Sequence, residues 1–255
     1  EERRNALKLQ KSAVAKLHEV PSMTACNQNY KRLFYCRYAD DFLIGVNGSQ
    51  EDALAIKEQF KEFLGKALHL EMSDEKTKIT HGTDKARFLG YDITTSKNSA
   101  LMYEKKHQLR KTHTGVIKLY APRDKWQRKL MEYGALSIRY GEDGKEIWGS
   151  KHRGNMVHMT DVEIVSTVNA EIRGMYNYYS IANNATVIKN FAFILEYSMY
   201  KTFGLKYRKS VYKIQRKFRK NGIFCVPYNA KTGLKYCEFY HDGFKHKKDT
   251  CRFNP

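Results

Sequence analysis

Two adjacent aspartates are the residues of this chain whose type and spacing are best suited to chemistry. Asp40 and Asp41 lie inside the stretch FYCRYADDFLIGV, residues 34–46, with apolar runs on either side. Neighbouring strand residues point to opposite faces, but at a tight turn the backbone leaves the pleat and both side chains can converge. Two close carboxylates repel each other unless a cation neutralises them, and hard oxygen ligands favour magnesium. The pair therefore predicts a two-metal site for phosphoryl transfer, whereas a solvated Asp-Asp loop is the competing interpretation.

The elements around the pair predict how it is held. Alternating side chains across residues 31–46 are typical of two short strands with the aspartates at the turn between them. A helix is expected over residues 50–69, with Ser49 as its N-cap and Asp52 in its first turn. The apolar stripe of this helix is expected to consist of Ala53, Ile56, Phe60, Phe63, Leu64 and Leu68.

Two further strand candidates follow, KTKIT at residues 76–80 and ARFLGYDI at residues 86–93. The order strand, turn, strand, helix, strand, strand is typical of an α+β domain. Residues 1–20 also have rough helical spacing of apolar residues.

The second part of the chain has a different pattern. A short helix is expected near residues 126–136, and the glycine-rich residues 139–155 predict an exposed loop or ribbon. A helix is predicted from Asp161 to about residue 184, with Thr160 and Glu163 as a partial capping box. Further helices are expected over residues 185–204, ending at Gly204, and over the basic residues 205–220, followed by a short-stranded or irregular tail.

The charge of the chain is distributed unevenly. The 255 residues carry a formal net charge of +19. Residues 1–100 contain 16 Lys and Arg against 14 Asp and Glu, whereas residues 101–255 contain 30 against 13. A strongly basic second part favours a polyanionic partner, most commonly nucleic acid. A merely solvated basic face is the alternative, which the mutual repulsion of so many charges disfavours.

The cysteines and the hydropathy pattern bear on location. Five widely spaced cysteines are an odd number, which favours free thiols in a reducing compartment. No apolar run approaches the roughly 18 residues of a membrane span, and no secretory signal is recognisable. We therefore expect a cytoplasmic protein with no membrane partner. Zinc is disfavoured, because the spacing of Cys225, Cys237, His241, His246 and Cys251 is too loose for a common zinc knuckle.

Several motifs together resemble one protein family. The residues Tyr38-Ala39-Asp40-Asp41 resemble the YxDD box of reverse transcriptases, and the continuation Phe42-Leu43-Ile44 resembles the proteins encoded by group II introns. Residues 70–80 resemble the next motif of the polymerase palm, and residues 86–93 resemble the hairpin that grips the primer terminus. The downstream stretches resemble domain X, the maturase domain that doubles as the thumb (158–184 and 198–210), and the start of the DNA-binding region (222–228).

The resemblance implies roles for individual residues. Asp40 would bind catalytic magnesium directly, and Asp41 would be a supporting ligand. Lys76 would donate a proton to the leaving pyrophosphate or stabilise its charge, with a solvated lysine as the alternative. Gly90 would let a nucleic-acid backbone approach closely, while Phe88 and Leu89 are also expected to pack. The residues implied in primer or substrate binding are Tyr38, Ala39, Phe88, Leu89, Gly90 and Tyr91.

A basic segment is the candidate RNA surface. Residues 201–220 contain nine Lys and Arg and no acidic residue. If the segment were helical, Lys206, Lys209, Lys213, Arg216, Lys217 and Lys220 would form one broad face able to bind phosphates without reading sequence. Tyrosines in this part are expected mostly to pack. The RNA-binding candidates are Arg173, Lys201, Lys206, Arg208, Lys209, Lys213, Arg216, Lys217 and Lys220.

The sequence as a whole predicts an α+β fold in three parts. Residues 1–98 are expected to be part of a reverse-transcriptase palm, residues 99–221 the thumb and domain X, and residues 222–255 the start of the DNA-binding region. The expected function is an RNA-directed DNA polymerase and splicing maturase that binds group II intron RNA and copies it into DNA during retrohoming. Magnesium, dNTPs and target DNA are its expected ligands, and a homodimer is left open.

Alternative functions remain. A non-enzymatic RNA-binding splicing cofactor is disfavoured by the intact aspartate pair, and a retron or defence-type reverse transcriptase by the domain X resemblance. A palm-type nucleotide cyclase would not need the basic second half. The only acidic residues before Phe34 are Glu1, Glu2 and Glu19, none in a strand-like context. A third carboxylate is therefore expected from outside this chain, and the chain taken alone is expected not to synthesise DNA.

Overall fold

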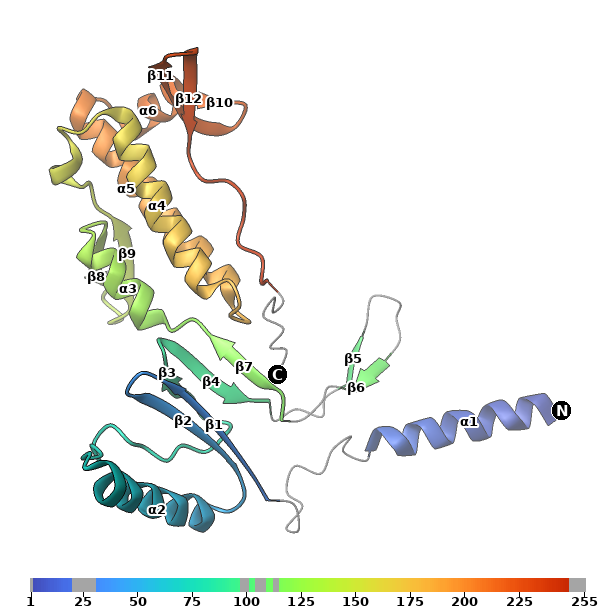
Figure 1. Cartoon of the computed structure of the whole chain (residues 1–255). Helices are drawn as coiled ribbons and strands as arrows, with labels where there is room; N and C mark the ends of the chain where they lie inside the picture. The colour runs from blue at the N-terminus through green and yellow to red at the C-terminus, as the bar shows by residue number, and fades with distance from the viewer. Residues whose placement is uncertain (1, 20–30, 97–100, 104–108, 112–114, 248–255) are drawn as a thin grey trace. The chain divides into compact units, whose positions relative to one another are not determined.

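The chain forms two compact units, Glu1–Lys118 and Leu119–Pro255 (Figure 1). The computed structural model describes residues 2–19, 31–96, 101–103, 109–111 and 115–247. No helix in these ranges combines the length and the hydrophobicity that a membrane crossing requires. The sequence-based boundaries after residues 98 and 221 differ from this division, which follows Lys118.

The first unit is built mainly from hairpins. Strands β1 and β2 pair antiparallel, as do β3 with β4 and β5 with β6, while β7 lies next to β4 in a three-stranded sheet of order β3-β4-β7. The chain passes into the second unit within β7. The bounds are α1 (Glu2–Glu19), β1 (Arg32–Tyr38), β2 (Asp41–Asn47), α2 (Gln50–Leu68), β3 (Ala86–Phe88), β4 (Tyr91–Thr95), β5 (Leu101–Tyr103), β6 (Leu109–Lys111) and β7 (Ile117–Tyr120).

Helix α2 begins where the sequence predicted, at a complete capping box. The Asp52 amide donates to Ser49 Oγ over 3.1 Å, and the Asp52 carboxylate accepts the Ser49 amide over 2.9 Å. Lys31 donates to the same carboxylate at 2.7 Å. This bond from Lys31, followed by the Ser49 backbone bond, lowers the pKa of Asp52 to about 2. The start of α2 is thereby tied to the residue that precedes β1.

The α2 stripe is narrower than expected. Ala53, Ile56, Phe60 and Leu64 are half-buried, and the Phe60 ring lies 4.8 Å from that of Phe42 on β2. Phe63 and Leu68 are exposed, contrary to the prediction. A two-stranded ribbon is too narrow to cover the whole stripe.

The strand predicted at residues 76–80 is wrong. This segment is irregular, and residues 74–76 form a turn closed by a bond from the Thr77 amide to the Ser73 carbonyl at 3.0 Å. Asp74 forms ion pairs with Lys57 and Lys61 of α2, at 3.2 and 2.6 Å. These polar contacts hold the segment against the helix, where it has no strand ladder to join.

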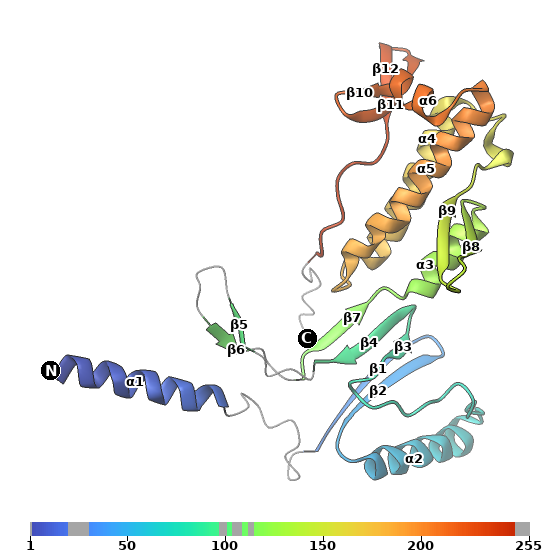
Figure 2. The same ribbon diagram turned by 180° about the vertical axis from the view of Figure 1, so that it is seen from behind.

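The second unit is organised around two long helices, α4 and α5, which lie side by side in both ribbon views (Figures 1 and 2). The side chains of these two helices that are fully buried include Ile164, Val168, Ile172, Ile188 and Leu195. The bounds are α3 (Arg123–Glu132), β8 (Leu136–Tyr140), β9 (Glu146–Ser150), η1 (Gly154–Met156), α4 (Asp161–Tyr179), η2 (Ala185–Val187), α5 (Ile188–Tyr207), α6 (Val211–Phe218), β10 (Arg219–Lys220), β11 (Ile223–Ala230) and β12 (Gly233–Glu238).

Most predictions for this unit are confirmed in kind but not in extent. The capping box of Thr160 and Glu163 is present. The ribbon predicted at residues 139–155 is the β8–β9 hairpin, which already begins at Leu136. Helix α4 ends at Tyr179, earlier than expected, and α5 passes Gly204 without ending. Gly204 is required for another reason, since a Cβ there would lie 2.9 Å from the Lys209 carbonyl oxygen.

The basic segment 205–220 is not one helix. Arg208 caps α5 in the left-handed conformation with φ of 51°, and Ser210 then begins the short helix α6. Residues 219–220 are already a strand, β10. The prediction of a single basic helical face is therefore wrong.

The tail after Gly222 belongs to the same compact unit. Strands β10, β11 and β12 form an antiparallel sheet, and Phe224 and Val226 of β11 are buried against the helices. Residues 239–247, which we call the strap, then run beside α4. The region that resembles the start of a DNA-binding module thus completes the core of the second unit.

A nearly buried ion pair joins the loop after β9 to α4. Arg153 donates two hydrogen bonds to the Glu171 carboxylate in a bidentate contact, at 2.7 and 2.8 Å. Its guanidinium lies 5.4 Å from the centre of the Tyr133 ring. The Arg153 amide also donates to Thr202 Oγ1 of α5 at 2.9 Å. Both charged side chains have lost most of their water, so each depends on the other.

We expect Glu171→Gln to destabilise the second unit by about 3–5 kcal/mol, because it leaves the buried Arg153 charge without its counter-charge. Both tryptophans of the chain, Trp126 and Trp148, lie in this unit, so urea unfolding followed by tryptophan fluorescence measures it selectively. The matched control is Glu132→Gln, which breaks an exposed pair with Lys129 and is expected to leave the midpoint unchanged. Equal effects of the two variants would contradict the prediction.

Candidate functional site

The aspartate pair lies at the end of the β1–β2 hairpin. Tyr38 pairs directly with Asp41, so that Ala39 and Asp40 form a two-residue turn. Ala39 has a φ of 53°, a left-handed conformation that is costly for a residue with a Cβ. The Arg37 side chain donates through Nε to the Ala39 carbonyl at 2.7 Å, which helps to hold this turn. Asp40 is thus a turn residue and Asp41 the first residue of β2.

The two faces of this hairpin differ. Residues paired across an antiparallel ladder share a face, which places Tyr38, Asp41 and Cys36 on one side and Tyr35 and Phe42 on the other. The second side packs on Phe60 of α2. On the first side, Tyr38 is 66% exposed. Phe34 is 61% exposed, because its partner across the ladder, Gly45, has no side chain to cover it. The face that carries Asp41 is therefore open.

The two carboxylates are exposed, and neither side chain forms a hydrogen bond or ion pair with another described residue. Their oxygen chemistry suits magnesium, since unpaired hard ligands are what this ion binds. Across the described residues, however, no group of three acidic, histidine or cysteine side chains is placed to hold a metal. Asp40 and Asp41 can supply two ligands, and the described residues do not complete the site.

The other palm candidates lie on a second hairpin and in a turn. Phe88 and Tyr91 pair at the end of β3–β4, and Leu89 and Gly90 form the turn between them, with φ of 47° and 75°. All four residues are half-buried. Gly90 is therefore required by the turn itself, since both residues of this tight turn need positive φ. Lys76 lies in the exposed turn after α2.

A buried carboxylate in this hairpin escaped the sequence analysis. Asp92 is 7% exposed and accepts two hydrogen bonds from Arg87 on the neighbouring strand, at 2.9 and 3.1 Å. The two residues are directly paired between β3 and β4. Their spacing across a two-residue turn is the signal that could have predicted this pair.

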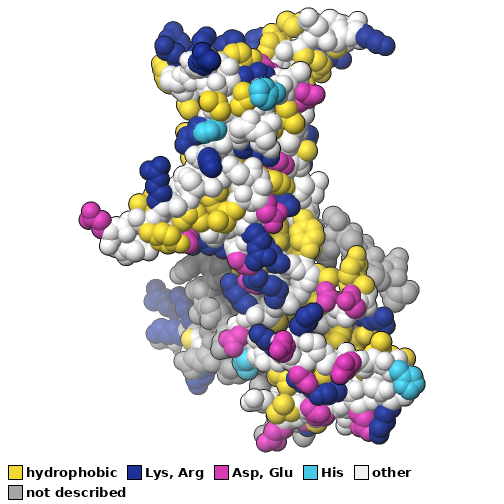
Figure 3. Space-filling view, turned by 90° about the vertical axis from the view of Figure 1, so that its left-hand side faces the viewer, with side chains coloured by type: hydrophobic (Ala, Val, Ile, Leu, Met, Phe, Trp, Pro, Cys, Tyr) yellow, Lys and Arg dark blue, Asp and Glu magenta, His cyan; other side chains and the backbone are white. Residues whose placement is uncertain are grey.

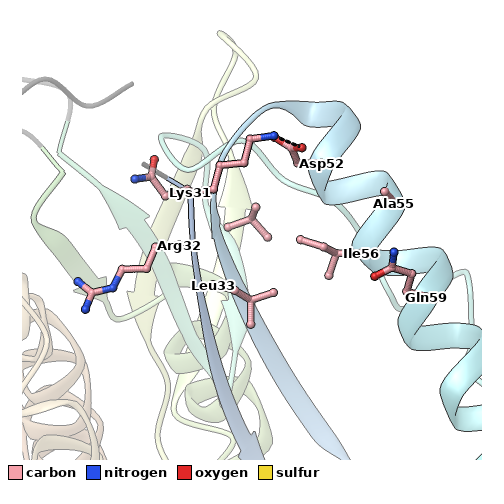
Figure 4. A pocket seen from close by; sticks show the side chains of 9 residues that line it. Lys31, Arg32, Leu33, Asp52, Ala55, Ile56 and Gln59 are labelled. Atoms are coloured by element: carbon pink, nitrogen blue, oxygen red, sulfur yellow. Dashed lines mark hydrogen bonds and ion pairs between the residues drawn. The ribbon is translucent and has the colours of Figure 1, made fainter. Parts of the chain in front are cut away.

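A small pocket lies between β1 and α2 (Figure 4). It has a volume of about 320 Å³. Leu33 and Ile56 point into it, and the Lys31–Asp52 ion pair crosses one end. The pocket lies beside the packed face of the hairpin, so it is separate from the open face that carries Asp41.

Two of the basic candidates have structural partners. Lys206 is half-buried, pairs with Asp161 at 2.8 Å and donates to the Met159 carbonyl. Lys201 donates to the Ser150 carbonyl at 2.6 Å. Tyr207 also donates to Asp161 at 2.5 Å, and burial together with this hydrogen bond raises the pKa of Tyr207 to about 12. Lys206 and Tyr207 thus join the start of α4 to the end of α5, and Lys201 joins α5 to the end of β9.

The remaining basic candidates near α6 are exposed. Lys217 lies over the ring of Tyr207, and Lys220 lies 4.0 Å from the ring centre of Tyr236, so both also have a packing role. On the face drawn in Figure 3, Lys and Arg side chains occur in separate groups rather than in one continuous band. We call the exposed cations beside the short helix the α6 surface: Arg208, Lys209, Lys213 and Arg216.

The structure separates Arg173 from these residues. Arg173 is exposed in the middle of α4, three turns from the end of that helix that meets the α6 surface. Cys225 and Cys237 lie on opposite faces of the β11–β12 ladder, because Cys237 pairs with Val226, so the two thiols do not converge. Cys251 lies outside the described residues.

Comparison with known families divides the chain near the boundary of its two units. Residues 15–93 match the model of the family described as reverse transcriptase (RNA-dependent DNA polymerase). Residues 114–251 match that of the type II intron maturase family. The second match includes α3 to α6, the β10–β12 sheet and the strap, which the structure also holds together.

Curated relatives agree with both matches. The chain is 36% identical over 219 residues to the group II intron-encoded protein LtrA of Lactococcus lactis subsp. cremoris, covering 86% of this chain and 36% of the relative. It is 34% identical over 209 residues to the putative COX1/OXI3 intron 1 protein of Saccharomyces cerevisiae, covering 79% and 24%. The chain therefore spans about a third or less of the length of these relatives.

The turn that presents the aspartates yields a prediction. Ala39→Gly is expected to stabilise the β1–β2 hairpin by about 1 kcal/mol, because glycine adopts positive φ without the Cβ clash. Amide hydrogen exchange of the two strands should slow accordingly. Ala55→Gly in α2, where Ala55 is exposed at the edge of the pocket, is the control, with an expected destabilisation of about 1 kcal/mol. Loss of stability in both variants would show that Ala39 carries no strain.

Proposed function

We propose, since the chain belongs to the type II intron maturase family, that it is part of a group II intron reverse transcriptase that also assists splicing. Its first unit would contribute to RNA-directed DNA synthesis, and its second unit would bind intron RNA. The observation that carries this proposal is the open hairpin face with Asp41 and Tyr38, joined in one chain to a strongly basic helical unit.

Asp40 and Asp41 are proposed as ligands of catalytic magnesium, together with oxygen ligands from outside the described residues. The bound ion would activate the primer hydroxyl and stabilise charge on the leaving pyrophosphate. The turn at Ala39 holds the two carboxylates at the tip of the hairpin, where substrate has access. Tyr38, on the same face as Asp41, would lie against the primer end.

The second hairpin is proposed to grip the primer. Phe88, Leu89, Gly90 and Tyr91 are only half-buried, so part of each is available to nucleic acid. The Arg87–Asp92 pair holds the two strands in register behind the turn. Lys76, in an exposed turn, would meet the leaving pyrophosphate only with the substrate in place.

The second unit is proposed to bind intron RNA through the α6 surface. Arg208, Lys209, Lys213 and Arg216 are exposed, and Lys206 is fixed in a structural ion pair and is therefore a supporting residue. Such cations bind phosphate without reading sequence. Target DNA and dNTPs are proposed as further ligands, in a cytoplasmic ribonucleoprotein particle.

The metal role of the pair can be tested in a chimera in which residues 15–255 replace the matching part of the Lactococcus lactis LtrA protein. Asp40→Ala is expected to lower primer extension on an RNA template by about a hundredfold or more, since several kcal/mol of charge stabilisation are lost. Intron RNA affinity should stay unchanged. The control is Asp84→Ala, an exposed aspartate outside the site. If Asp40→Ala extends primers as well as the control does, Asp40 is not a metal ligand.

The α6 surface can be tested by charge reversal. The triple variant Lys209→Glu, Lys213→Glu, Arg216→Glu is expected to weaken intron RNA binding and to lower the slope of log affinity against log salt by up to about three, one per lost phosphate contact. The control reverses Lys8, Lys11 and Lys16 on α1, with the same change in net charge. Filter binding over a series of salt concentrations distinguishes them, and equal slopes would refute this assignment.

A further inference from the structure

The strap is attached to α4 by specific polar contacts. Asn169, 5% exposed, donates through Nδ2 to the Glu238 carbonyl at 2.7 Å and accepts the Tyr240 amide at 2.8 Å. Two turns further along the same helix, the Tyr176 hydroxyl donates to the Lys245 carbonyl at 2.8 Å. The course of the strap beside α4 is visible in both ribbon views (Figures 1 and 2).

The end of the strap is held at the end of α4. The Lys247 amide donates to the Ser180 carbonyl at 2.8 Å, and His246 Nδ1 lies 2.9 Å from the Ala182 carbonyl oxygen. The Phe244 ring packs edge-on against Tyr176 at 5.4 Å. The course of the strap backbone is thus fixed by α4 and by the turn that follows it.

Arg173 lies on the same side of α4 as the strap. It is four residues after Asn169 and three before Tyr176, spacings that share one helix face, and both neighbours bind the strap. Burial raises the pKa of the Tyr240 hydroxyl, and the nearby Arg173 charge acts in the opposite direction. Arg173 is therefore close to the strap, although it is exposed itself.

Exposed cations gather along this line. Lys245 and Lys247 are exposed on the strap, and the Lys247 ammonium lies 5.3 Å from the centre of the Tyr176 ring. Asp242 is the acidic residue within the strap. We call Arg173, Lys245 and Lys247 the strap surface.

The strap surface and the α6 surface lie toward opposite ends of α4. The α6 surface follows the end of α5, which Tyr207 and Lys206 join to Asp161 at the start of α4. Lys247 is bound at Ser180, 19 residues further on, which corresponds to about 28 Å of helix. Arg173, 12 residues after Asp161, is nearer, at about 18 Å of helix. Both distances exceed the Debye length of about 8 Å at physiological salt, so the solvent-exposed charges of the two surfaces are largely screened from each other.

We propose that the strap surface is a second RNA-binding surface, and that the maturase unit holds two separate RNA segments, one near the start of α4 and one along the strap, from the middle of α4 to its end. This inference rests on the proposed function, that the unit binds intron RNA. The phosphate backbone of the second segment would lie along Arg173, Lys245 and Lys247. The strap would then be required to place two of the three cations.

The test compares two triple charge reversals in the full chain. One is Arg173→Glu, Lys245→Glu, Lys247→Glu, and the other is the α6 triple described above. Affinity for a group II intron RNA is measured by filter binding over a series of salt concentrations, with a DNA duplex of random sequence as a second probe. Each triple variant is expected to lower the slope of log RNA affinity against log salt by up to about three. The variant that carries all six substitutions is expected to lower this slope by the sum of the two losses.

The outcomes separate the two proposals. If the α6 triple weakens RNA binding and the strap triple does not, the strap surface is overturned and the proposed function stands. If neither triple weakens it, RNA binding by this unit fails as a whole. The second RNA segment is also overturned if the variant with all six substitutions loses no more RNA affinity than one triple variant does. The same follows if the strap triple weakens binding of DNA but not of RNA.

A single substitution tests the strap surface without the risk that three charge reversals unfold the protein. Arg173 forms no bond to the strap backbone that the fold depends on, so Arg173→Glu should keep the wild-type unfolding curve and still lower the RNA salt slope by about one. Arg173→Lys keeps the charge and is expected to restore the slope. A slope unchanged by Arg173→Glu in a folded protein contradicts the proposal.

Discussion

The first unit depends on the pairing of Tyr38 with Asp41, because this pairing leaves only two residues in which the chain can reverse. It forces Ala39 into the left-handed region and places Asp41 at the first position of a strand. The same register directs Tyr35 and Phe42 onto α2, so one face of the hairpin is covered and the other, with Asp41, stays open. A slip by one residue would exchange the two faces and bury the carboxylate.

The second unit is held together by contacts between segments far apart in sequence. Arg153 bonds to Glu171 and Thr202, and Asp161 accepts hydrogen bonds from Lys206 and Tyr207. Asn169 donates to the Glu238 carbonyl and accepts from the Tyr240 amide at the start of the strap. Several of these partners are charged or strongly polar side chains in a basic protein. Part of the positive charge is thereby used to build the fold, and the exposed remainder is available for a polyanion.

The candidate site was largely predictable from local sequence, and the arrangement of the cations was not. The hairpin, the capping boxes at Ser49 and Thr160 and the turn at Leu89–Gly90 depend on residues only a few positions apart. The interpretation of residues 205–220 as one helix failed because helical spacing alone does not reveal that Gly204 must accommodate the Lys209 carbonyl, after which the chain turns. Lys206 likewise gave no local sign that Asp161, 45 residues earlier, would bind it.

The sequence by itself therefore determined the family motifs, the order of the elements and the strongly basic character of the second half, since these follow from residue types and short spacings. Only the tertiary structure decided which face of the aspartate hairpin is open, which cations remain exposed and that Arg173 lies beside the strap. Those properties depend on contacts such as Asn169 with Tyr240, whose residues are 71 positions apart. No local pattern encodes such contacts, because they form only when the helices and the strap pack together.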